Sequence, residues 1–96
     1  MSVLVVFTAQ LKEGTEEPYL ALSRKVIKYA HWQPGLLSME RGRSVITERG
    51  IISISEWKSE EALQTWKEHP VHRQAQEIAV KELFESYSLK KANIIK

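Results

Sequence analysis

The chain has 96 residues and contains neither cysteine nor aspartate. Without cysteine there can be no disulfide bond, no thiolate metal site and no cysteine nucleophile. All 12 acidic residues are therefore glutamates, which excludes a triad oriented by aspartate, an EF-hand loop and a magnesium site with aspartate ligands.

Long apolar runs and a strong charge of one sign are also missing. No apolar stretch approaches the ~18 residues of a membrane-spanning helix, and the N-terminus lacks a signal-peptide pattern. The net charge is only +2, with lysine and arginine interleaved with glutamate, so no basic surface for nucleic acid is indicated. We expect a single cytoplasmic domain over residues 1–96, with neither nucleic acid nor a membrane as a partner.

The first third of the chain predicts a strand followed by a helix. Apolar residues alternate along Ser2–Lys12, which predicts the strand. Glu13-Gly14 ends this strand, and Thr15 is placed to cap a helix whose apolar residues recur at spacings of three and four. We expect the helix to run to about His31, shortly before Pro34-Gly35.

Two more strands are expected after this helix. Leu36–Ser44 predicts the first of them, with Leu37, Met39 and Arg41 on one face. The polar stretch that follows is typical of a turn. Gly50–Trp57 alternates again and predicts the second strand, which would form a hairpin with the first.

The last third of the chain predicts two helical segments and a final strand. Ser59 is placed to cap a helix whose apolar stripe includes Trp66. Pro70 interrupts that helix but suits the first turn of a second segment. Glu85–Ile95 has the composition of a strand.

The resulting order, β-α-β-β-α-β, predicts the ferredoxin-like α+β fold, in which a four-stranded antiparallel sheet carries helices on one face. Val5 and Ile52 lie near the centre of the expected sheet, and both faces of its first and third strands carry apolar residues. Both faces must then be buried, which predicts a homodimer that packs sheet on sheet.

Two tryptophans stand out as candidate site residues. Trp66 is either a core aromatic residue or an indole that lines a cavity and donates its N–H to a substrate oxygen. The position of Trp57 at the end of a strand indicates a packing role, but Trp57 is also a candidate substrate contact.

Two histidines flank the proline that interrupts the second helix. The His-x-x-His spacing of His69 and His72 lacks a third ligand at helical spacing, so we expect no metal site. Either imidazole can act as a general base near neutral pH. His69 is preferred because it follows Trp66 by one turn on nearly the same face, whereas His72 is interpreted as a flanking or capping residue within reach of a substrate.

Charged residues on the expected strands are less specific. Arg41 is placed either to reach an anionic substrate or to be solvated. Glu56 and Trp57 point to opposite faces of a strand, so one of them points inward. A buried Glu56 would need a partner, with Arg41 and Lys58 as the candidates.

Nearly the whole chain resembles the antibiotic biosynthesis monooxygenase family of small dimeric α+β barrel proteins. The resemblance rests on PGLLSME after the first helix, on ISISEWKSEEALQTWKEHPVHRQAQ, and on SYSLKKANI in the last strand. It implies a dimer whose two sheets form a barrel. It also implies cofactor-independent oxygenation of a small aromatic or quinol substrate, or haem degradation in a related branch.

The haem-degrading branch uses an asparagine on the first strand, a tryptophan on the second helix and a histidine ten residues later. Trp66 matches the tryptophan, but Gln76 stands at the histidine position and Phe7 near the asparagine position. Two of the three residues are missing, which disfavours haem degradation by that arrangement. His69 or His72 could still ligate haem from a different place.

We expect a cofactor-free enzyme that oxidises a small aromatic or quinol compound in a cavity between sheet and helices. Trp66 would position the substrate, and His69 would deprotonate a phenolic hydroxyl so that the anion can give an electron to oxygen. His72, Trp57 and Arg41 are the expected substrate contacts. The alternatives are a haem-degrading protein and a non-catalytic dimer that binds a small ligand, because this fold hosts many functions.

Overall fold

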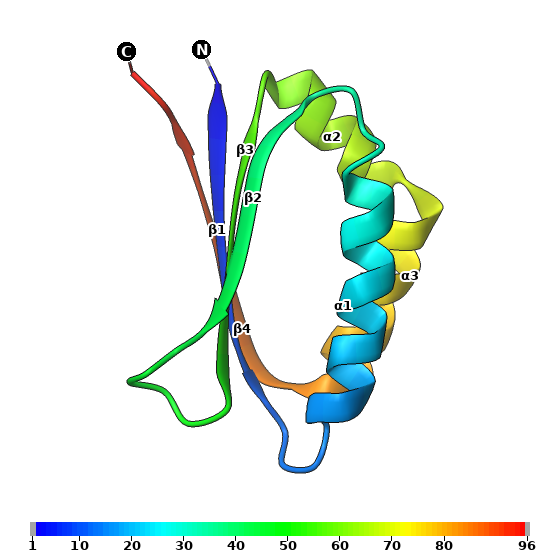
Figure 1. The fold of residues 1–96 in the computed structure, drawn as a ribbon, viewed down its shortest axis with the longest axis vertical. Helices are drawn as coiled ribbons and strands as arrows, with labels where there is room; N and C mark the ends of the chain where they lie inside the picture. The colour runs from blue at the N-terminus through cyan, green and yellow to red at the C-terminus, as the bar shows by residue number, and fades with distance from the viewer. Residues whose placement is uncertain (1, 96) are drawn as a thin grey trace.

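The computed structural model describes residues 2–95 and contains one antiparallel sheet with helices over one face (Figure 1). The helices are α1 (Glu16–Ala30), α2 (Glu60–Glu68) and α3 (Pro70–Ile78), and α3 continues into a π-helical turn, η1 (Ala79–Leu83). The strands are β1 (Val3–Leu11), β2 (Leu36–Arg43), β3 (Gly50–Trp57) and β4 (Phe84–Asn93). The predicted order and the ferredoxin-like α+β class are confirmed, while the π-helical turn was not expected.

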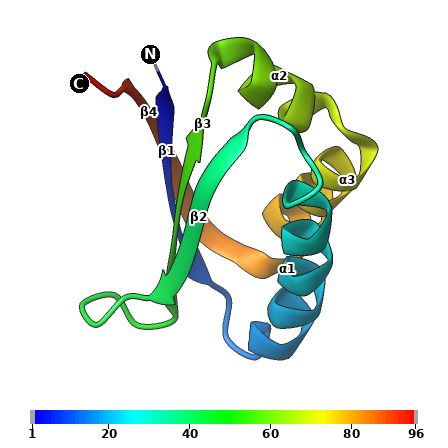
Figure 2. The ribbon, with the colours of Figure 1, turned by 45° about the horizontal axis from the view of Figure 1, so that its top comes forward.

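The sheet has the strand order β2-β3-β1-β4, so β1 and β3 are its inner strands. Alternate residues of a strand point to opposite faces, and Val5 of β1 lies opposite Ser55 of β3 on the face that the helices cover. Figure 2 shows all the helices on this one side of the sheet. Among the helices described, none has the length and apolar character needed to span a bilayer.

The core lies between the sheet and the helices and has two parts. The first contains two nearly inaccessible indoles, Trp57 at 1% and Trp66 at 4% exposure. Val3, Val5, Ala30 and Leu63 complete this part. The second is smaller and lies toward the other end of the sheet, and its buried members are Ala9, Leu11 and Ile51.

Two hydroxyl residues precede helices, and only one of them caps its helix. Ser59 caps α2 as predicted, because its Oγ accepts a hydrogen bond of 3.1 Å from the backbone N–H of Ala62. Thr15 precedes α1, but its Oγ1 donates to the carbonyl oxygens of Lys12 at 2.7 Å and Leu83 at 3.2 Å. Thr15 therefore ties the turn before α1 to the end of η1.

A bulge near the start of β2 changes which residues face the core. The register shifts between Leu36 and Ser38, so the prediction that Leu37 shares a face with Met39 and Arg41 is wrong. Leu36 packs against the core, whereas Leu37 is 55% exposed. Beyond the bulge, Met39 and Arg41 do share the face that points to the helices.

Of the neighbouring residues Glu56 and Trp57, it is Trp57 that points inward, into the core. Glu56 lies on the opposite face of β3, where its Oε2 accepts a hydrogen bond of 2.7 Å from Ser2 Oγ. Neither Arg41 nor Lys58 is the partner that a buried Glu56 would have required.

The sheet face away from the helices is not covered by any other part of the described chain (Figure 2). Its centre is apolar, with Val6 opposite Ile54 and with Ile52 nearby, and Ile54 is 42% exposed. Next to this centre, the hydroxyl oxygens of Thr8 and Ser88 form a hydrogen bond of 2.8 Å. An exposed apolar centre is the feature that the predicted sheet-on-sheet dimer requires.

Candidate functional site

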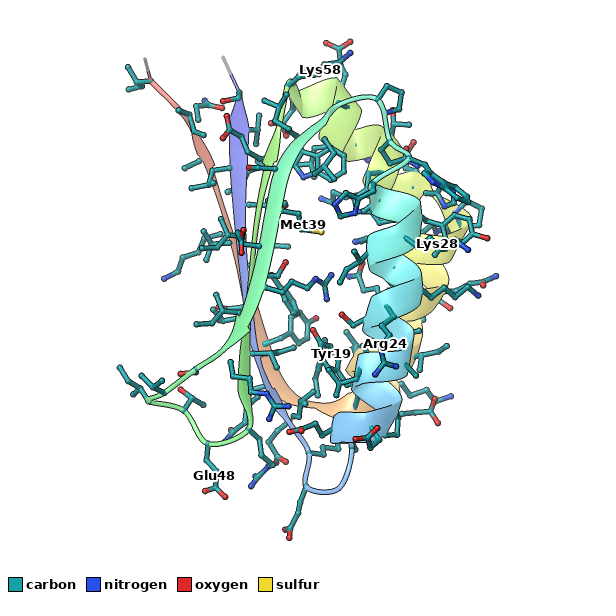
Figure 3. The ribbon with its side chains drawn as sticks, in the orientation of Figure 1. Tyr19, Arg24, Lys28, Met39, Glu48 and Lys58 are labelled. Atoms are coloured by element: carbon teal, nitrogen blue, oxygen red, sulfur yellow. The ribbon has the colours of Figure 1, made fainter. Side chains whose placement is uncertain are left out.

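A cleft opens between α1, β2 and the β2–β3 loop, on the helix-covered side of the sheet. Its volume is 660 Å³, which lies within the usual range for small-molecule sites. In Figure 3, Tyr19 and Met39 point into the space between sheet and helices, and Glu48 extends from the loop. The cleft lining combines apolar side chains such as Leu20, Ile27 and Ile51 with the charged residues Glu16, Arg24, Arg41, Arg43, Glu48 and Arg49.

Two of the arginines that line the cleft are paired with its glutamates. Arg43 donates two hydrogen bonds to Glu16, at 3.0 and 2.7 Å. Arg49 donates to Glu48 at 3.0 Å. These pairs are largely exposed and add little stability, but they neutralise both acidic residues of the cleft.

Arg24 and Arg41 are the other two cations of the cleft. Neither forms an ion pair with an acidic residue of the described chain. Arg24 is exposed, so water solvates its guanidinium. Arg41 is partly buried, so its charge has lost part of its water without gaining a carboxylate partner.

Neutral hydroxyl groups of α1 hold Arg41 in place. Arg41 Nη1 donates to Ser23 Oγ at 2.5 Å and to Tyr19 Oη at 3.2 Å. Arg41 Nε is buried and has no hydrogen-bond partner among the described residues. Nη2 takes part in none of the hydrogen bonds found within residues 2–95. Arg41 therefore keeps a free edge of two N–H donors.

A cluster of aromatic rings lies in the core near Met39, which shares a face of β2 with the cleft residue Arg41 and packs against the core. We call Tyr29, Trp57, Trp66, His69 and His72 the aromatic cluster. Trp66 is at its centre, with ring centroids 6.3 Å from Trp57, 5.5 Å from His69 and 5.2 Å from His72.

The two indoles of the cluster differ in their hydrogen bonds. Trp57 Nε1 donates to Ser55 Oγ at 3.0 Å. Trp66 Nε1 makes none of the hydrogen bonds found between described residues. Trp57 thus has no N–H to offer a substrate, whereas Trp66 does.

His69 turns out to be a capping residue, a role that the sequence had suggested for His72 instead. It ends α2 and precedes α3, and its Nδ1 accepts a hydrogen bond of 3.1 Å from the backbone N–H of Val71. In a neutral imidazole only one ring nitrogen is an acceptor. His69 would therefore have to give up this cap in order to accept a proton from a substrate.

His72 lies in the first turn of α3, and its ring meets Trp66 edge to face. Its Nδ1 is buried and has no hydrogen-bond partner in the part of the chain that the structure describes. Burial lowers the pKa of His72, and Lys67, Arg41 and His69 act in the same direction, while the backbone of Lys67 partly opposes the change. At neutral pH His72 is therefore uncharged, as a general base must be.

The five predicted site residues occupy different depths of the structure. Arg41 lines the cleft. Trp66, His69 and His72 lie together in the aromatic cluster, Trp57 stacks on Trp66, and none of these four residues lines the cleft.

Sequence reasoning missed the contribution of α1 to this site. Ser23 is buried and Tyr19 partly buried, and both bind Arg41. A serine on the otherwise apolar stripe of the helix was the available signal, because a buried hydroxyl needs a hydrogen-bond partner.

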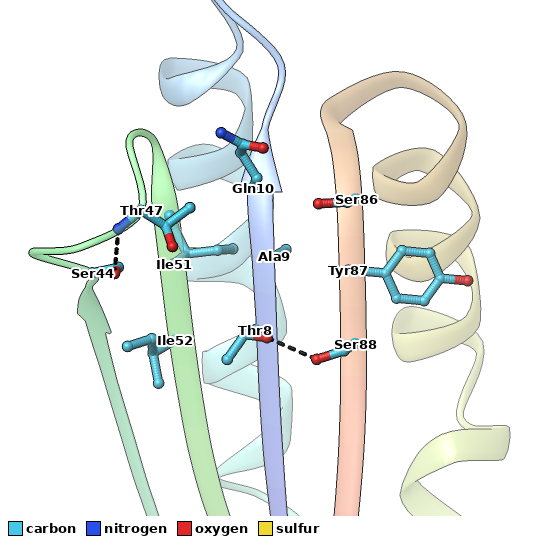
Figure 4. A pocket seen from close by; sticks show the side chains of 11 residues that line it. Thr8, Ala9, Gln10, Ser44, Thr47, Ile51, Ile52, Ser86, Tyr87 and Ser88 are labelled. Carbon is cyan, nitrogen blue, oxygen red and sulfur yellow. Dashed lines mark hydrogen bonds between the residues drawn. The ribbon is translucent and has the colours of Figure 1, made fainter.

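Two other pockets are weaker candidates for a reactive site. One, of 330 Å³, lies on the open face of the sheet and is lined largely by hydroxyl groups, including the bonded pair Thr8 and Ser88 (Figure 4). The other, of 590 Å³, lies beside α3, η1 and β4 and includes Gln76, which is exposed. The residue at the haem-ligand position therefore lies on a surface that Trp66 does not line. Within residues 2–95, no three His, Cys, Asp or Glu side chains gather in one place.

This chain is a small ferredoxin-like α+β protein that has a cleft large enough for a small molecule and a cluster of buried aromatic rings. The family model for antibiotic biosynthesis monooxygenase matches residues 2–78. This chain belongs to the antibiotic biosynthesis monooxygenase family, as the sequence resemblance implied.

Individual proteins are similar to this chain over most of its length. YqjZ of Bacillus subtilis (strain 168), an uncharacterized protein, is 30% identical over 90 residues, which are 94% of this chain and 76% of that protein. Rv0793 from Mycobacterium tuberculosis has a TM-score of 0.90 at 14% identity, covering 100% of this chain and 97% of its own. A mutant of SnoaB, a cofactor-independent oxygenase from Streptomyces nogalater, has a TM-score of 0.83 at 14% identity, covering 99% and 94%. These two structures share the fold with this chain.

Proposed function

We propose that this chain is a monooxygenase that oxidises a small phenol or quinol at the inner end of the cleft, using no cofactor. The observation that carries the proposal is His72, an uncharged imidazole whose buried Nδ1 has no partner within residues 2–95 and whose ring touches Trp66. Membership of the monooxygenase family supports the reaction class. SnoaB, which shares the fold, is a cofactor-independent oxygenase.

The substrate would bind where the cleft meets the aromatic cluster. Met39 and Arg41 are two residues apart on one face of β2, which is about 7 Å along a strand. A ring bound against Arg41 therefore reaches Met39, an unbranched side chain that adapts readily to a ligand. Its hydroxyl would point to His72, and the N–H of Trp66 is available to the same oxygen.

The first chemical step would be a proton transfer. His72 Nδ1 takes the proton of the substrate hydroxyl, and this leaves an electron-rich phenolate. The phenolate transfers one electron to dioxygen, and the resulting aryloxyl radical and superoxide combine to form a carbon–oxygen bond.

The second step would break the oxygen–oxygen bond of this peroxide. One oxygen atom stays on the ring and the other leaves as water, so that hydroquinone and dioxygen give hydroxyquinone and water. The substrate supplies all the electrons. Protonated His72 would return its proton to the departing oxygen, because the nearby charge of Arg41 disfavours a second cation.

We also propose that the working form is a cytoplasmic homodimer joined through the open face of the sheet. Val6, Ile52 and Ile54 form an apolar centre on that face. Burying such a surface against its own copy removes it from water.

Oxygen uptake by the purified protein tests this function, with hydroquinones and naphthols as substrates and a protein-free blank for autoxidation. We expect uptake above the blank, and a loss of about 100-fold in His72→Gln, because a general base contributes at least that much. His31→Gln is the matched control, since His31 is exposed at the end of α1, and it should keep the full rate.

The other outcomes each select a different account. Full activity in His72→Gln would place the base elsewhere. Uptake only with haem and a reductant would favour the haem-degrading alternative. No uptake above the blank with any compound would favour a non-catalytic dimer that binds a small ligand.

A further inference from the structure

We infer that the substrate carries a carboxylate group that binds the free edge of Arg41, so that the cleft accepts hydroxylated aromatic acids. This inference rests on the proposed function, and it adds the chemical class of the substrate. Within the described chain, Arg41 contacts no negatively charged group, and a carboxylate of the substrate would supply one.

Arg41 lacks a counterion among the described residues. A guanidinium that leaves water loses much of its solvation, and only an opposing charge or a full set of acceptors restores it. Ser23 and Tyr19 are uncharged, and both bind the same nitrogen, Nη1. The remaining donors of Arg41, on Nη2 and on the buried Nε, have no acceptor within the described chain.

The free edge of Arg41 has the shape that a carboxylate requires. Nε and Nη2 of a guanidinium lie side by side and can bind both oxygens of one carboxylate. In Arg41 this is the edge left without partners, while Ser23 and Tyr19 fix the orientation of the group through Nη1. The site is therefore preorganised for a planar anion with two oxygens.

The rest of the cleft combines paired charges with apolar surface. Its two glutamates, Glu16 and Glu48, are each paired with an arginine, and Arg24 is the one other unpaired cation of the described lining. Leu20 and Ile27 offer apolar surface to a hydrocarbon body. This combination favours a monoanion attached to an aromatic ring.

A chain of contacts links Arg41 to the proposed base. Arg41 and Met39 share one face of β2, Met39 packs against the core that contains Trp66, and the ring of Trp66 meets that of His72. A substrate that places its carboxylate on Arg41 would therefore hold its hydroxyl near His72, which orients the ring for the proton transfer.

A binding experiment under argon tests the inference without turnover. The probes are 1,4-dihydroxy-2-naphthoate and its carboxamide, which differ in charge but hardly in shape, and the signal is quenching of tryptophan fluorescence. We expect the wild-type protein to bind the acid about tenfold or more tightly than the amide, because hydrogen bonds to a charged group are the stronger ones.

Two variants test whether Arg41 is the source of the preference for the acid. In Arg41→Gln the preference for the acid should fall to about twofold or less, since the guanidinium is gone. Lys28→Gln removes one positive charge from an exposed position of α1, where Lys28 lies over the ring of Trp32. This control should keep the wild-type preference, because the site is local and not a general effect of charge.

Several results would overturn the inference. They are equal affinity of the wild type for acid and amide, a preference that survives in Arg41→Gln, and displacement of the acid by an equal concentration of inorganic phosphate. If Arg41→Gln does not fold by circular dichroism, Arg41→Lys keeps the charge but lacks the two-nitrogen edge, and it should lose most of the preference.

The outcome is separable from that of the proposed function. A protein that prefers the acid but consumes no oxygen retains the carboxylate site and is not the proposed oxygenase. A protein that oxidises neutral quinols as fast as the corresponding acids is an oxygenase without a carboxylate site.

Discussion

Acid should destabilise the folded chain through His72. Burial lowers the pKa of His72 in the folded chain, and Lys67 and Arg41 act in the same direction. In the unfolded chain the ring is solvated and has an ordinary pKa of about 6.5. As the pH falls through this value, the unfolded chain binds a proton first, so unfolding becomes more favourable. The stability that depends on uncharged His72 is present above the unfolded pKa and is lost as the pH falls toward the folded one.

The pKa of His72 in the unfolded chain limits the size of this effect. Between pH 7.5 and pH 5.5, one group with an unfolded pKa of about 6.5 can change the unfolding equilibrium by up to about tenfold, or about 1.4 kcal/mol. The full amount appears if the folded chain keeps His72 uncharged throughout this interval.

Urea unfolding at several pH values measures the effect. Trp57 and Trp66 are buried, so their fluorescence reports on unfolding, and all samples need one protein concentration because a dimer is stabilised by mass action. Between the two pH values, wild type and the control His31→Gln should lose up to about 1.4 kcal/mol more stability than His72→Gln. An equal loss in wild type and His72→Gln would refute the conclusion that His72 is buried in its uncharged form.

Three further substitutions test the fold and the assembly. His69→Ala removes the cap of α3 and should lower the free energy of unfolding by about 1 kcal/mol, measured in urea, while leaving oxygen uptake largely intact. A side chain at Gly35 would overlap the alanine of α2, so Gly35→Ala should cost about 1–3 kcal/mol in the same assay. Gly42→Ala meets open space and should be close to neutral. Ile54→Glu should convert a dimer into monomers in light scattering, whereas Val45→Glu, at a fully exposed position of the β2–β3 loop, should not.

Most of the fold could be predicted because its signals are local. The alternation of β1 and β3 and the cap at Ser59 each depend on neighbouring residues alone. The bulge at Leu37 depends on how β2 pairs with β3. A residue pattern in β2 cannot reveal that register by itself, so Leu37 was assigned to the wrong face.

The candidate site was harder to predict because burial and contacts decide the roles of its residues. Helical spacing from Trp66 favoured His69 as the base, although its position just before Pro70 is that of a cap. Arg41 was a candidate from the start, but its free edge depends on hydroxyl groups of another element, including Ser23. Such a contact between distant parts of the chain leaves little trace in the local pattern.

The most direct test of the central claim is the isotopic composition of the product formed from 1,4-dihydroxy-2-naphthoate under ¹⁸O-labelled dioxygen. Monooxygenation predicts one labelled oxygen atom in each product molecule, formed faster by the wild type than by His72→Gln. A product without label, with the consumed oxygen recovered as hydrogen peroxide, would contradict the account.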